Sequence, residues 1–569
     1  MTGSLAVFNL AVVHEAIAAE HPDRECLVWR DRHLTWGQVN DRSRRFAGLL
    51  RAHGLGLHDE RSHLAGWESG QDMVALFCRN SPAYLEAMLG SYKARCAPCN
   101  VNFRYTAGEL AYLLTDARAS AVVFDADLAP VVIEALAGWA DPPLLIAIAP
   151  HPDQIAGGSS GDGAAAAAAT SLAISRSAGP VYDYETAIAD AEPWIDPACS
   201  PDDLYVLYTG GTTGKPKGVL WRQGDFITGA LGYKAKSLED AVHKSERGEL
   251  LRVLPTAPFM HGAAHWNAWS AWLAGGTVIM QSVSDRLDAA DVWDTAIAER
   301  ASSVQLVGDA FAVPLLDELE RRAAINGAMP SSVKFVMSGG VGLSADNKRK
   351  FLDLLGDVRV VDIVGSSESG RQGVHTSSHN AGAASGRFEP SHGATVLDET
   401  KTHELAPGSD AIGWLATAGH VPLGYLGDRE RTAATFPVVG DKRYSVAGDR
   451  ARRGADGSIE LLGRESVTIN TGGEKVFAEE VEDALKTHPA VLDAIVVGRP
   501  SERWGAEVVA VVALRTDDVD DKELVEAAGR ILARYKLPKT IVRRPQLQRS
   551  PSGKPDYAWA RAQVTVQGT

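Results

Sequence analysis

The sequence predicts an α/β protein with a large N-terminal domain and a small α+β C-terminal domain. A chain of 569 residues is longer than one hydrophobic core usually supports. Short apolar runs alternate with helical stretches over most of the chain, which is typical of βα units and a mainly parallel sheet. From about residue 386 to 462 the pattern changes to short strands and turns, so we expect a small β-barrel-like subdomain there. A separate βαββα pattern follows, and we therefore expect domains at 1–465 and 466–569.

The first βα units occupy the N-terminal part of the chain. Thr35 is a good N-cap residue and precedes a helical stretch with periodic apolar positions. Further elements are predicted at 73–77 (strand), 83–94 (helix), 107–114 (helix) and 121–124 (strand). Residues 157–177 are rich in glycine, serine and alanine and lack apolar periodicity. We expect this run to be a surface insertion between two βα units.

A second series of strands carries polar residues at two of its ends. The strands are predicted at 251–254, 277–280, 303–307, 334–337 and 358–364, with a helix at 289–300. The fourth strand runs into Ser338-Gly339-Gly340, and the fifth runs into Gly365-Ser366-Ser367-Glu368. Because α/β sheets bind ligands at the carboxyl ends of their strands, both turns are candidate binding loops. In the C-terminal domain the elements are predicted at 478–487 (helix), 494–498 (strand), 507–514 (strand) and 522–535 (helix).

Composition excludes several classes of protein. The formal net charge of −15 argues against a nucleic-acid-binding surface. The first 19 residues lack the basic region of a signal peptide, and no run of 18 apolar residues follows, so we expect a cytoplasmic protein without a membrane span. Among the five cysteines, Cys96 and Cys99 have the spacing of a redox or half-zinc motif. No second pair accompanies them, so we expect buried reduced thiols.

One glycine- and threonine-rich stretch predicts a polyphosphate site. It runs from Tyr208 to Val219 and follows the apolar run 204–207. Its glycines allow main-chain N–H groups to converge on an anion, and its hydroxyls and lysines add donors and positive charge. The candidate phosphate-binding residues are Thr209, Gly210, Gly211, Thr212, Thr213, Gly214 and Lys217. The spacing differs from that of a Walker P-loop, which argues against a kinase or GTPase.

This stretch resembles the phosphate loop of the adenylate-forming superfamily, which comprises acyl-CoA ligases, nonribosomal adenylation domains and firefly-type luciferases. Further motifs resemble the superfamily in the same order between about residues 208 and 557. The resemblance implies an ATP site, Mg2+ and a mobile C-terminal domain. Besides the loop, the implied ATP-binding residues are Gly339, Gly340, Gly365, Ser366, Ser367, Asp449 and Arg464.

Three of these motif residues have implied roles. Glu368 matches the glutamate that holds Mg2+ on ATP, and a hard cation suits a carboxylate with water and phosphate oxygens. The chain departs from the motif at Val364 and Ser367, which replace an aromatic residue and a threonine. Asp449 resembles the aspartate that accepts hydrogen bonds from both ribose hydroxyls. Arg464 resembles an arginine that contacts ribose or phosphate. In isolation, each carboxylate would be interpreted as a solvated or turn residue.

The C-terminal domain carries an implied catalytic lysine and an implied CoA tunnel. Lys554 follows a Ser-x-Gly turn and resembles the lysine that reaches the substrate carboxylate and the α-phosphate, where a cation reduces the repulsion between two anions. The run 469–476 resembles the strand that forms the pantetheine tunnel; the implied CoA-binding residues are Gly472, Gly473 and Lys475. A β-bulge is the alternative interpretation of those glycines. Glu465 and Ser466 are the expected hinge.

The acyl pocket is implied by a second set of residues. The candidates are His261, Gly262, Trp266, Gly342 and Arg371. The resemblance places His261 at the mouth of the pocket, near the reacting carboxylate, and so implies a catalytic role together with Lys554, Glu368 and Arg464. His261 and His265 have the spacing of a zinc motif, but the glutamate between them is absent, so we do not expect zinc. Small residues such as Gly262 and Gly342 would leave room for a bulky acid. The sequence resembles actinobacterial ligases for fatty, steroid side-chain and terpenoid acids.

The predicted activity is therefore an AMP-forming acid-thiol ligase that uses ATP, Mg2+ and coenzyme A to convert a bulky lipophilic acid into its CoA thioester. A narrower hypothesis is that Arg371, or a bulky neighbour such as Trp266 or Trp269, crowds the site. Only the thioester half-reaction would then remain, on an acyl-adenylate supplied by a partner enzyme. Three further hypotheses are an acyl-AMP ligase that feeds a carrier protein, a luciferase-like oxygenase and a silent nucleotide-binding regulator. The expected small-molecule partners are the acid or its acyl-adenylate and CoA. A second copy of this chain, in a homodimer, is the protein partner to be tested.

Overall fold

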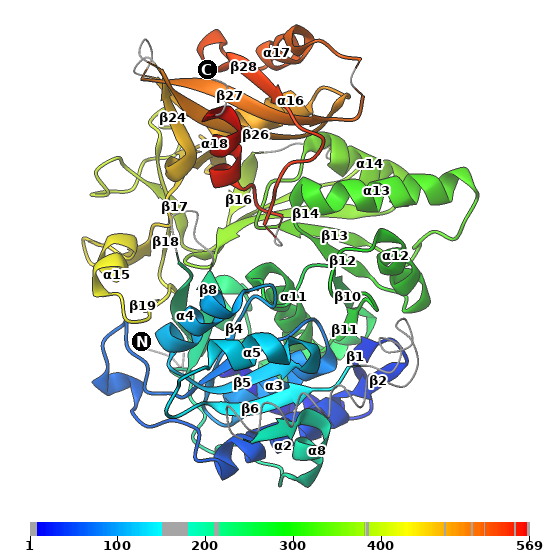
Figure 1. Ribbon diagram of the computed structural model, residues 1–569, viewed down its shortest axis with the longest axis vertical. Coiled ribbons are helices and arrows are strands. Elements are labelled where there is room, and N and C mark those ends of the chain that lie inside the picture. Colours follow the sequence, from blue (N-terminus) through cyan, green and yellow to red (C-terminus); the bar gives the residue numbers. More distant parts are fainter. Residues whose placement is uncertain are drawn as a thin grey trace. The chain divides into compact units, whose positions relative to one another are not determined.

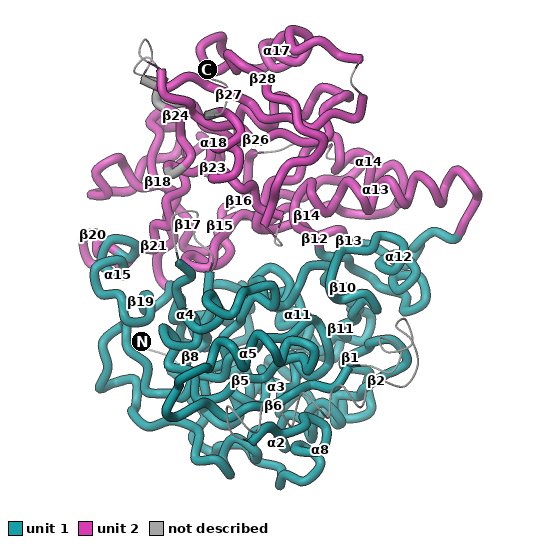
Figure 2. The backbone as a smooth tube through the Cα atoms, viewed as in Figure 1, with its two compact units in different colours: residues 1–305, 328–334, 420–436 teal, residues 306–327, 335–419, 437–569 magenta. Residues whose placement is uncertain are grey.

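The computed structural model describes residues 8–150, 180–209, 215–380, 382, 386–471, 474–501, 505–516, 518–550 and 553–565. The chain divides into two compact units (Figure 2). The first comprises residues 1–305, 328–334 and 420–436, and the second comprises 306–327, 335–419 and 437–569. Helices and strands are mixed throughout, which confirms the predicted α/β class. The boundary expected at Glu465 lies within the second unit and stays a prediction, and the expected insertion 157–177 lies outside the described residues.

An eight-stranded sheet forms the centre of the first unit (Figure 1). In spatial order its strands are β19 (Gly424–Tyr425), β9 (Lys217–Arg222), β8 (Leu204–Thr209), β4 (Ala97–Asn100), β3 (Met73–Phe77), β5 (Ala119–Asp125), β6 (Leu144–Ile148) and β7 (Val181–Asp183). The strands from β8 to β7 are parallel, whereas β9 is antiparallel to β8. Every residue of β3 is buried, because helices cover both faces of this sheet.

A second group of strands in the first unit is also mainly parallel. Its members are β2 (Arg32–Thr35), β1 (Glu25–Trp29), β11 (Thr277–Met280), β10 (Arg252–Pro255) and β12 (Ser303–Leu306). Only the β1–β2 pair is antiparallel within this group.

The helices of the first unit largely follow the predicted pattern. They are α1 (Leu10–Glu20), α2 (Trp36–Ala52), α3 (Pro82–Lys93), α4 (Ala107–Ala117), α5 (Ala129–Ala135), α8 (Tyr184–Asp190), α9 (Gln223–Asp225), α10 (Leu238–Ser245), α11 (Gly262–Leu273), α12 (Ala289–Ala298) and α15 (Arg429–Thr435). Thr35 caps α2 and forms a capping box with Gln38. Leu110 and Leu114 of α4 pack with Phe77 and Phe124 of the sheet, so the core lies between these helices and the strands.

The second unit contains a long, mainly antiparallel sheet. Its strands are β13 (Phe335–Gly339), β14 (Arg359–Ser366), β15 (Gly370–Ser377), β16 (Arg387–Pro390), β17 (Ala394–Leu397), β18 (Gly413–Ala418), β20 (Val438–Val439), β21 (Lys442–Ser445), β22 (Asp449–Arg453) and β23 (Ile459–Arg464). Helices α13 (Gly308–Ala324) and α14 (Ala345–Leu355) precede β13 and β14. The short strands after β15 have a small core of their own around Val396, Leu415 and Ile459.

A five-stranded sheet with three helices follows. Its strands are β24 (Thr468–Thr471), β25 (Glu474–Phe477), β26 (Val491–Ser501), β27 (Gly505–Leu514) and β28 (Thr540–Arg543), and the helices are α16 (Ala478–Lys486), α17 (Asp521–Gly529) and α18 (Tyr557–Thr565). Strands β26 and β27 pair along most of their length. The predicted helix 522–535 was too long: α17 ends at Gly529, which packs close to Leu537 as the chain turns back.

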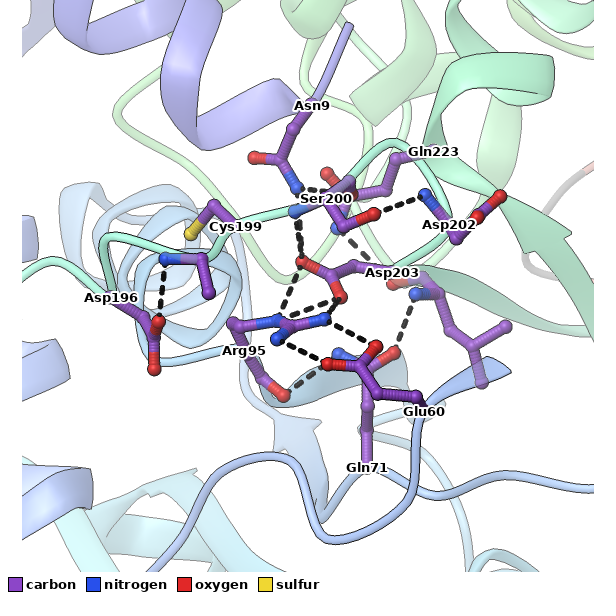
Figure 3. Close-up of polar contacts among 12 residues, drawn as sticks. Asn9, Glu60, Gln71, Arg95, Asp196, Cys199, Ser200, Asp202, Asp203 and Gln223 are labelled. Atoms are coloured by element: carbon purple, nitrogen blue, oxygen red, sulfur yellow. Dashed lines mark hydrogen bonds and ion pairs between the residues drawn. The ribbon is translucent and has the colours of Figure 1, made fainter. Parts of the chain in front are cut away.

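A buried charge network fixes the start of β8, the strand that leads to the predicted phosphate loop (Figure 3). Arg95 donates two hydrogen bonds to Asp203 Oδ1, from Nε at 3.0 Å and from Nη2 at 2.8 Å, and its guanidinium also bonds Glu60. Gln71 donates to the Arg95 carbonyl at 2.7 Å and accepts from the Leu204 N–H at 2.6 Å. Since Asp203 is 2% exposed, this ion pair is sheltered from water and holds the strand end firmly.

The cysteines carry no sign of redox or metal chemistry. All five are free, and Cys96 and Cys99 are buried, as expected. Burial raises the pKa of the Cys99 thiol to about 12, so it stays protonated and behaves as a small apolar group. No group of three or more His, Cys, Asp or Glu residues suited to a metal occurs among the described residues. No helix in the described part of the chain is long and apolar enough to cross a membrane.

Candidate functional site

The stem of the predicted phosphate loop is a β-hairpin in the first unit. Thr209 ends β8, Lys217 begins β9, and the two residues are paired in the antiparallel register. Gly210, Gly211, Thr212, Thr213 and Gly214 lie outside the described residues. Lys217 Nζ lies 3.7 Å from Asp116 Oδ1, and the other oxygen of that carboxylate, Oδ2, accepts a hydrogen bond from the Tyr208 hydroxyl at 2.9 Å. The hairpin therefore places a lysine at the base of the loop.

Asn100 connects this hairpin to the predicted acyl-pocket segment, and no sequence pattern indicated this role. Its side-chain amide accepts from the Tyr208 N–H at 2.7 Å and donates to the Tyr208 carbonyl at 2.9 Å and the Met260 carbonyl at 2.6 Å. Met260 precedes His261, which occupies the N-cap position of α11. A single buried amide thus fixes the end of β8 relative to His261.

The second histidine of the pair has a structural role. His265 is buried, and its Nδ1 lies 2.6 Å from the Phe259 carbonyl. Its Nε2 contacts the Tyr205 hydroxyl, which accepts from the Trp266 indole N–H at 2.6 Å. Burial lowers the pKa of His265 to about 4, so the ring is neutral and its Nε2 can accept a hydrogen bond from the Tyr205 hydroxyl. This chain of bonds fixes the Trp266 ring, whose Nε1 lies close to Gly262: a Cβ there would be 3.5 Å away.

Four predicted site residues come together in the second unit. Lys554 interacts electrostatically with Arg464, Glu368 and Asp449. Asp449 begins β22 and Arg464 ends β23, and these strands pair so that Arg464 Nε donates to Asp449 Oδ1 at 3.1 Å. Burial first, and then the Arg464 charge, lower the pKa of the Lys554 ammonium, while both carboxylates oppose this shift. Two cations thus lie among two carboxylates.

Hydrogen bonds from Ser445 hold the turn that carries Glu368. It connects β14 to β15, which form an antiparallel hairpin. The Ser445 hydroxyl donates to the Glu368 carbonyl at 2.7 Å and lies 2.9 Å from the Ser369 hydroxyl. A Cβ on Gly365 would lie 2.2 Å from the Gly370 carbonyl oxygen, so this turn requires glycine. Ser366 accepts from the Ser369 N–H at 3.1 Å, and Ser367 belongs to the same turn.

The remaining predicted residues of this unit that the structure describes lie on, or just after, strands β13, β15 and β25. Gly339 ends β13, and Gly340 has a φ of +89°, which glycine adopts without strain. A Cβ on Gly342 would meet nothing within 4 Å, so there is open space beside this residue. Arg371 lies on β15 beside Gly365; burial lowers its pKa, and its Nε has no hydrogen-bond partner among the described residues. Gly472 and Gly473 lie outside the described residues, and Lys475 lies on β25.

The expected hinge lies next to a buried glutamate that sequence reasoning missed. Residues Glu465–Val467 form a short 3-10 turn after β23. Glu479, in the first turn of α16, accepts from the Arg464 N–H at 3.0 Å. Gly463 has a φ of +128°, and a Cβ there would lie 2.1 Å from the Glu479 carboxylate, so the glycine makes room for it. Burial raises the pKa of Glu479 from 4.5 to about 7. Sequence analysis predicted the helix, but not that this carboxylate faces back to the hinge.

The cationic, donor-rich arrangement suits an anionic substrate. Lys554 and Arg464 supply positive charge, Asp449 offers carboxylate oxygens to hydroxyl donors, and Glu368 offers them to a cation. A single carboxylate fits Mg2+ when phosphate oxygens and water complete its coordination. The residues present therefore fit a magnesium nucleotide.

Comparisons with known proteins agree with this chemistry. The family model of the AMP-binding enzymes matches residues 14–426, and that of the AMP-binding enzyme C-terminal domain matches residues 480–554. The chain is 46% identical to a medium-chain acyl-CoA ligase (Mig) of Mycobacterium avium, over 99% of this chain and all of that protein. It is 36% identical to a 3-oxocholest-4-en-26-oate–CoA ligase of Rhodococcus rhodochrous, over 98% of this chain and 96% of that protein.

A solved structure supports the fold. The anthranilate CoA ligase AuaEII, in complex with anthranoyl-AMP, superposes with a TM-score of 0.76 and covers 98% of both chains. At 19% sequence identity, this likeness concerns the fold alone.

Proposed function

The chain belongs to the AMP-binding enzyme family, and on that premise we propose that it is an ATP-dependent acyl-CoA ligase for lipophilic carboxylic acids. The observation that carries this proposal is the cluster of Lys554, Arg464, Glu368 and Asp449 in the second unit. Two anions, a carboxylate and a triphosphate, must meet in the first half-reaction, and Lys554 and Arg464 supply the charge that this requires.

In the first half-reaction a carboxylate oxygen of the acid attacks the α-phosphorus of ATP. The bond between the α-phosphorus and the bridging oxygen breaks, and pyrophosphate leaves. Lys554 lowers the repulsion between the two anions; at about 4 Å and an effective dielectric of 20 that repulsion is about 4 kcal/mol. Asp449 accepts hydrogen bonds from the ribose hydroxyls and so orients the nucleotide. Glu368 would hold Mg2+, which neutralises charge on the phosphates when bound.

In the second half-reaction the CoA thiolate attacks the acyl carbonyl, and AMP leaves. We infer that the segment after Glu465 rotates between the two steps, withdraws Lys554 and presents the run 469–476 to the pantetheine arm. The short turn Glu465–Val467 is the hinge of this movement. The division into domains 1–465 and 466–569 follows from this proposal.

The acid is proposed from the relatives and from the open space beside Gly342. The two relatives are named for a medium-chain acid and for a steroid side-chain acid. The open space at Gly342 supports room for a bulky acyl group. Gly262 adds no room of its own, because a Cβ there would already lie 3.1 Å from Leu207 Cδ2 and 3.4 Å from the Trp266 ring. We propose that the substrate is a bulky lipophilic acid, either a long-chain acid or a polycyclic, steroid- or terpenoid-like acid. A cytoplasmic location and a homodimer remain predictions.

The test is a coupled assay with medium-chain, long-chain and steroid side-chain acids, scored separately for pyrophosphate and acyl-CoA. The proposal expects both products with at least one acid, and acyl-CoA only when CoA is present. Pyrophosphate release with no CoA thioester would indicate an acyl-AMP ligase instead. ATP binding without turnover of any acid would contradict the proposal and indicate a regulator.

Arg371 supports a second candidate, in which only the thioester half-reaction is retained. It is a large cation on β15, and its Nε has no hydrogen-bond partner among the described residues. In this candidate, such a side chain would crowd the space that a free carboxylate and ATP need together. This candidate expects no acid-dependent pyrophosphate exchange and normal thioester formation from a supplied acyl-adenylate. Robust exchange would dismiss it.

A further inference from the structure

The turn that carries Lys554 is closed on itself. The Gly553 N–H donates to the Ser550 carbonyl at 2.8 Å, and the Ser550 N–H donates to the Lys554 carbonyl at 2.8 Å. Gly553 has a φ of +74°, which permits this tight reversal. Arg549 and Pro555 form an isolated β-bridge at the base of the turn. Because these bonds tie Gly553 and Lys554 to Ser550, the direction of Lys554 depends on how its described neighbours Arg549 and Gly553 are anchored.

Arg549 anchors the turn to the C-terminal sheet. Its guanidinium makes a bidentate contact with Asp493, from Nε at 2.7 Å and from Nη2 at 2.6 Å. Its Nη1 donates to the Gly553 carbonyl at 2.8 Å. The Asp493 carboxylate also accepts from the Ala494 N–H at 2.8 Å, within β26. The planar guanidinium therefore bridges a strand of the sheet and the peptide group that precedes Lys554.

The other side of the turn rests on α13. A Cβ on Gly553 would lie 3.3 Å from the Val307 carbonyl oxygen and 3.4 Å from the Ala310 Cβ. Beside this contact, Lys486 of α16 lies 3.3 Å from a carboxylate oxygen of Asp309 on α13. Gly553 thus lies between Arg549 and the first turn of α13.

We propose that Arg549 and Asp493 are a positioning pair that directs Lys554 into the site during the adenylation half-reaction. This inference rests on the proposed function. The pair touches no reacting atom in this arrangement and acts through the Gly553 carbonyl. Lysine is no substitute for Arg549, because its ammonium cannot make the planar bidentate contact and the third bond together. A displacement of about 1 Å at a reacting group costs on the order of 100-fold in rate.

The test uses the full-length enzyme and four variants: Arg549→Lys, Arg549→Met, the double variant Arg549→Met/Asp493→Leu, and the control Arg543→Met. The double variant leaves no unpaired buried charge, so its stability recovers while the bond to Gly553 stays absent. The control breaks a comparable contact at 2.6 Å, between Arg543 and Asp521, within the same segment. Acid-dependent pyrophosphate exchange, thioester formation from a supplied acyl-adenylate and thermal unfolding are measured for each.

The expected result is a fall of about 100-fold in kcat for exchange in all three Arg549 variants, with KM for ATP changed by less than about threefold. Thioester formation should stay near the wild-type rate, because the proposed rotation withdraws Lys554 in that step. The control should retain both activities.

Three results would overturn the inference. Wild-type exchange in the double variant would show that the bond to Gly553 is unnecessary. Wild-type exchange in Arg549→Lys would show that charge alone suffices. A parallel fall of exchange and thioester formation would indicate a general structural role. Each of these leaves the proposed function standing, whereas a wild-type enzyme without either activity overturns the proposed function and this inference with it.

Discussion

Replacing Lys554 by methionine should suppress adenylation and spare thioester formation. Methionine keeps most of the length of the side chain and removes its charge. In the structure the ammonium interacts with Glu368, Asp449 and Arg464, and burial lowers its pKa, so its charge acts in a partly desolvated site. Two anions about 4 Å apart repel by about 4 kcal/mol at an effective dielectric of 20. Since about 1.4 kcal/mol corresponds to tenfold in rate, loss of the cation should slow adenylation by about 1,000-fold.

The assay follows the two half-reactions separately. Acid-dependent pyrophosphate exchange reports adenylation, and acyl-CoA formation from a synthetic acyl-adenylate reports the second step. The matched control is Lys522→Met, which removes an exposed lysine from α17 and should leave both rates unchanged. An equal loss of both activities in Lys554→Met would refute the assigned role, and so would exchange at the wild-type rate.

Three further predictions concern the hinge, the core and the acyl pocket. Burial raises the pKa of Glu479 to about 7, so the folded protein keeps a proton that the unfolded chain loses from about pH 4.5 upward, and stability should fall by up to about 3 kcal/mol as pH rises through 7. Glu479→Gln, whose amide oxygen still accepts from the Arg464 N–H, should flatten this dependence in unfolding curves measured across that range. Arg95→Met leaves the buried Asp203 carboxylate without its cation and should destabilise the fold by about 3–5 kcal/mol, measured by denaturant unfolding. Trp266→Phe removes the indole N–H and some bulk, so the ratio of kcat/KM for steroid side-chain acids to that for medium-chain acids should rise by about tenfold.

Each of these has a contradicting outcome. An unchanged pH dependence in Glu479→Gln would place the titration elsewhere. For Arg95→Met, the control is Arg349→Met, which breaks an exposed pair with Asp346 at 2.8 Å and should cost less than about 1 kcal/mol; equal losses would contradict the argument. An unchanged acid preference in Trp266→Phe would contradict the assignment of Trp266 to the acyl pocket.

Local sequence patterns predicted much of the fold. The predicted strand at 73–77 coincides with β3, and the Thr35 cap begins α2 where the pattern placed it. These elements are encoded by neighbouring residues, through apolar runs and side-chain capping. The α/β class, the superfamily and the ligase class were predicted and are confirmed. The end of α17 was misplaced, because the turn after Gly529 depends on a contact with Leu537 rather than on local propensity.

The candidate site was predicted only in part, for a physical reason. Motif order identified Glu368, Asp449, Arg464 and Lys554, and the structure places them in one cluster; their roles remain predictions. The residues that hold them were missed. Arg549 meets Asp493, 56 positions earlier in the chain, and such pairing depends on the folded sheet rather than on nearby sequence.

The most direct test of the central claim, that this cluster holds an adenylate, is a crystal structure of the protein with a hydrolysis-resistant acyl-adenylate analogue. We expect the ribose hydroxyls on Asp449 and the phosphate between Lys554 and Arg464. A nucleotide bound elsewhere, with Asp449 still facing only Arg464, would contradict the claim.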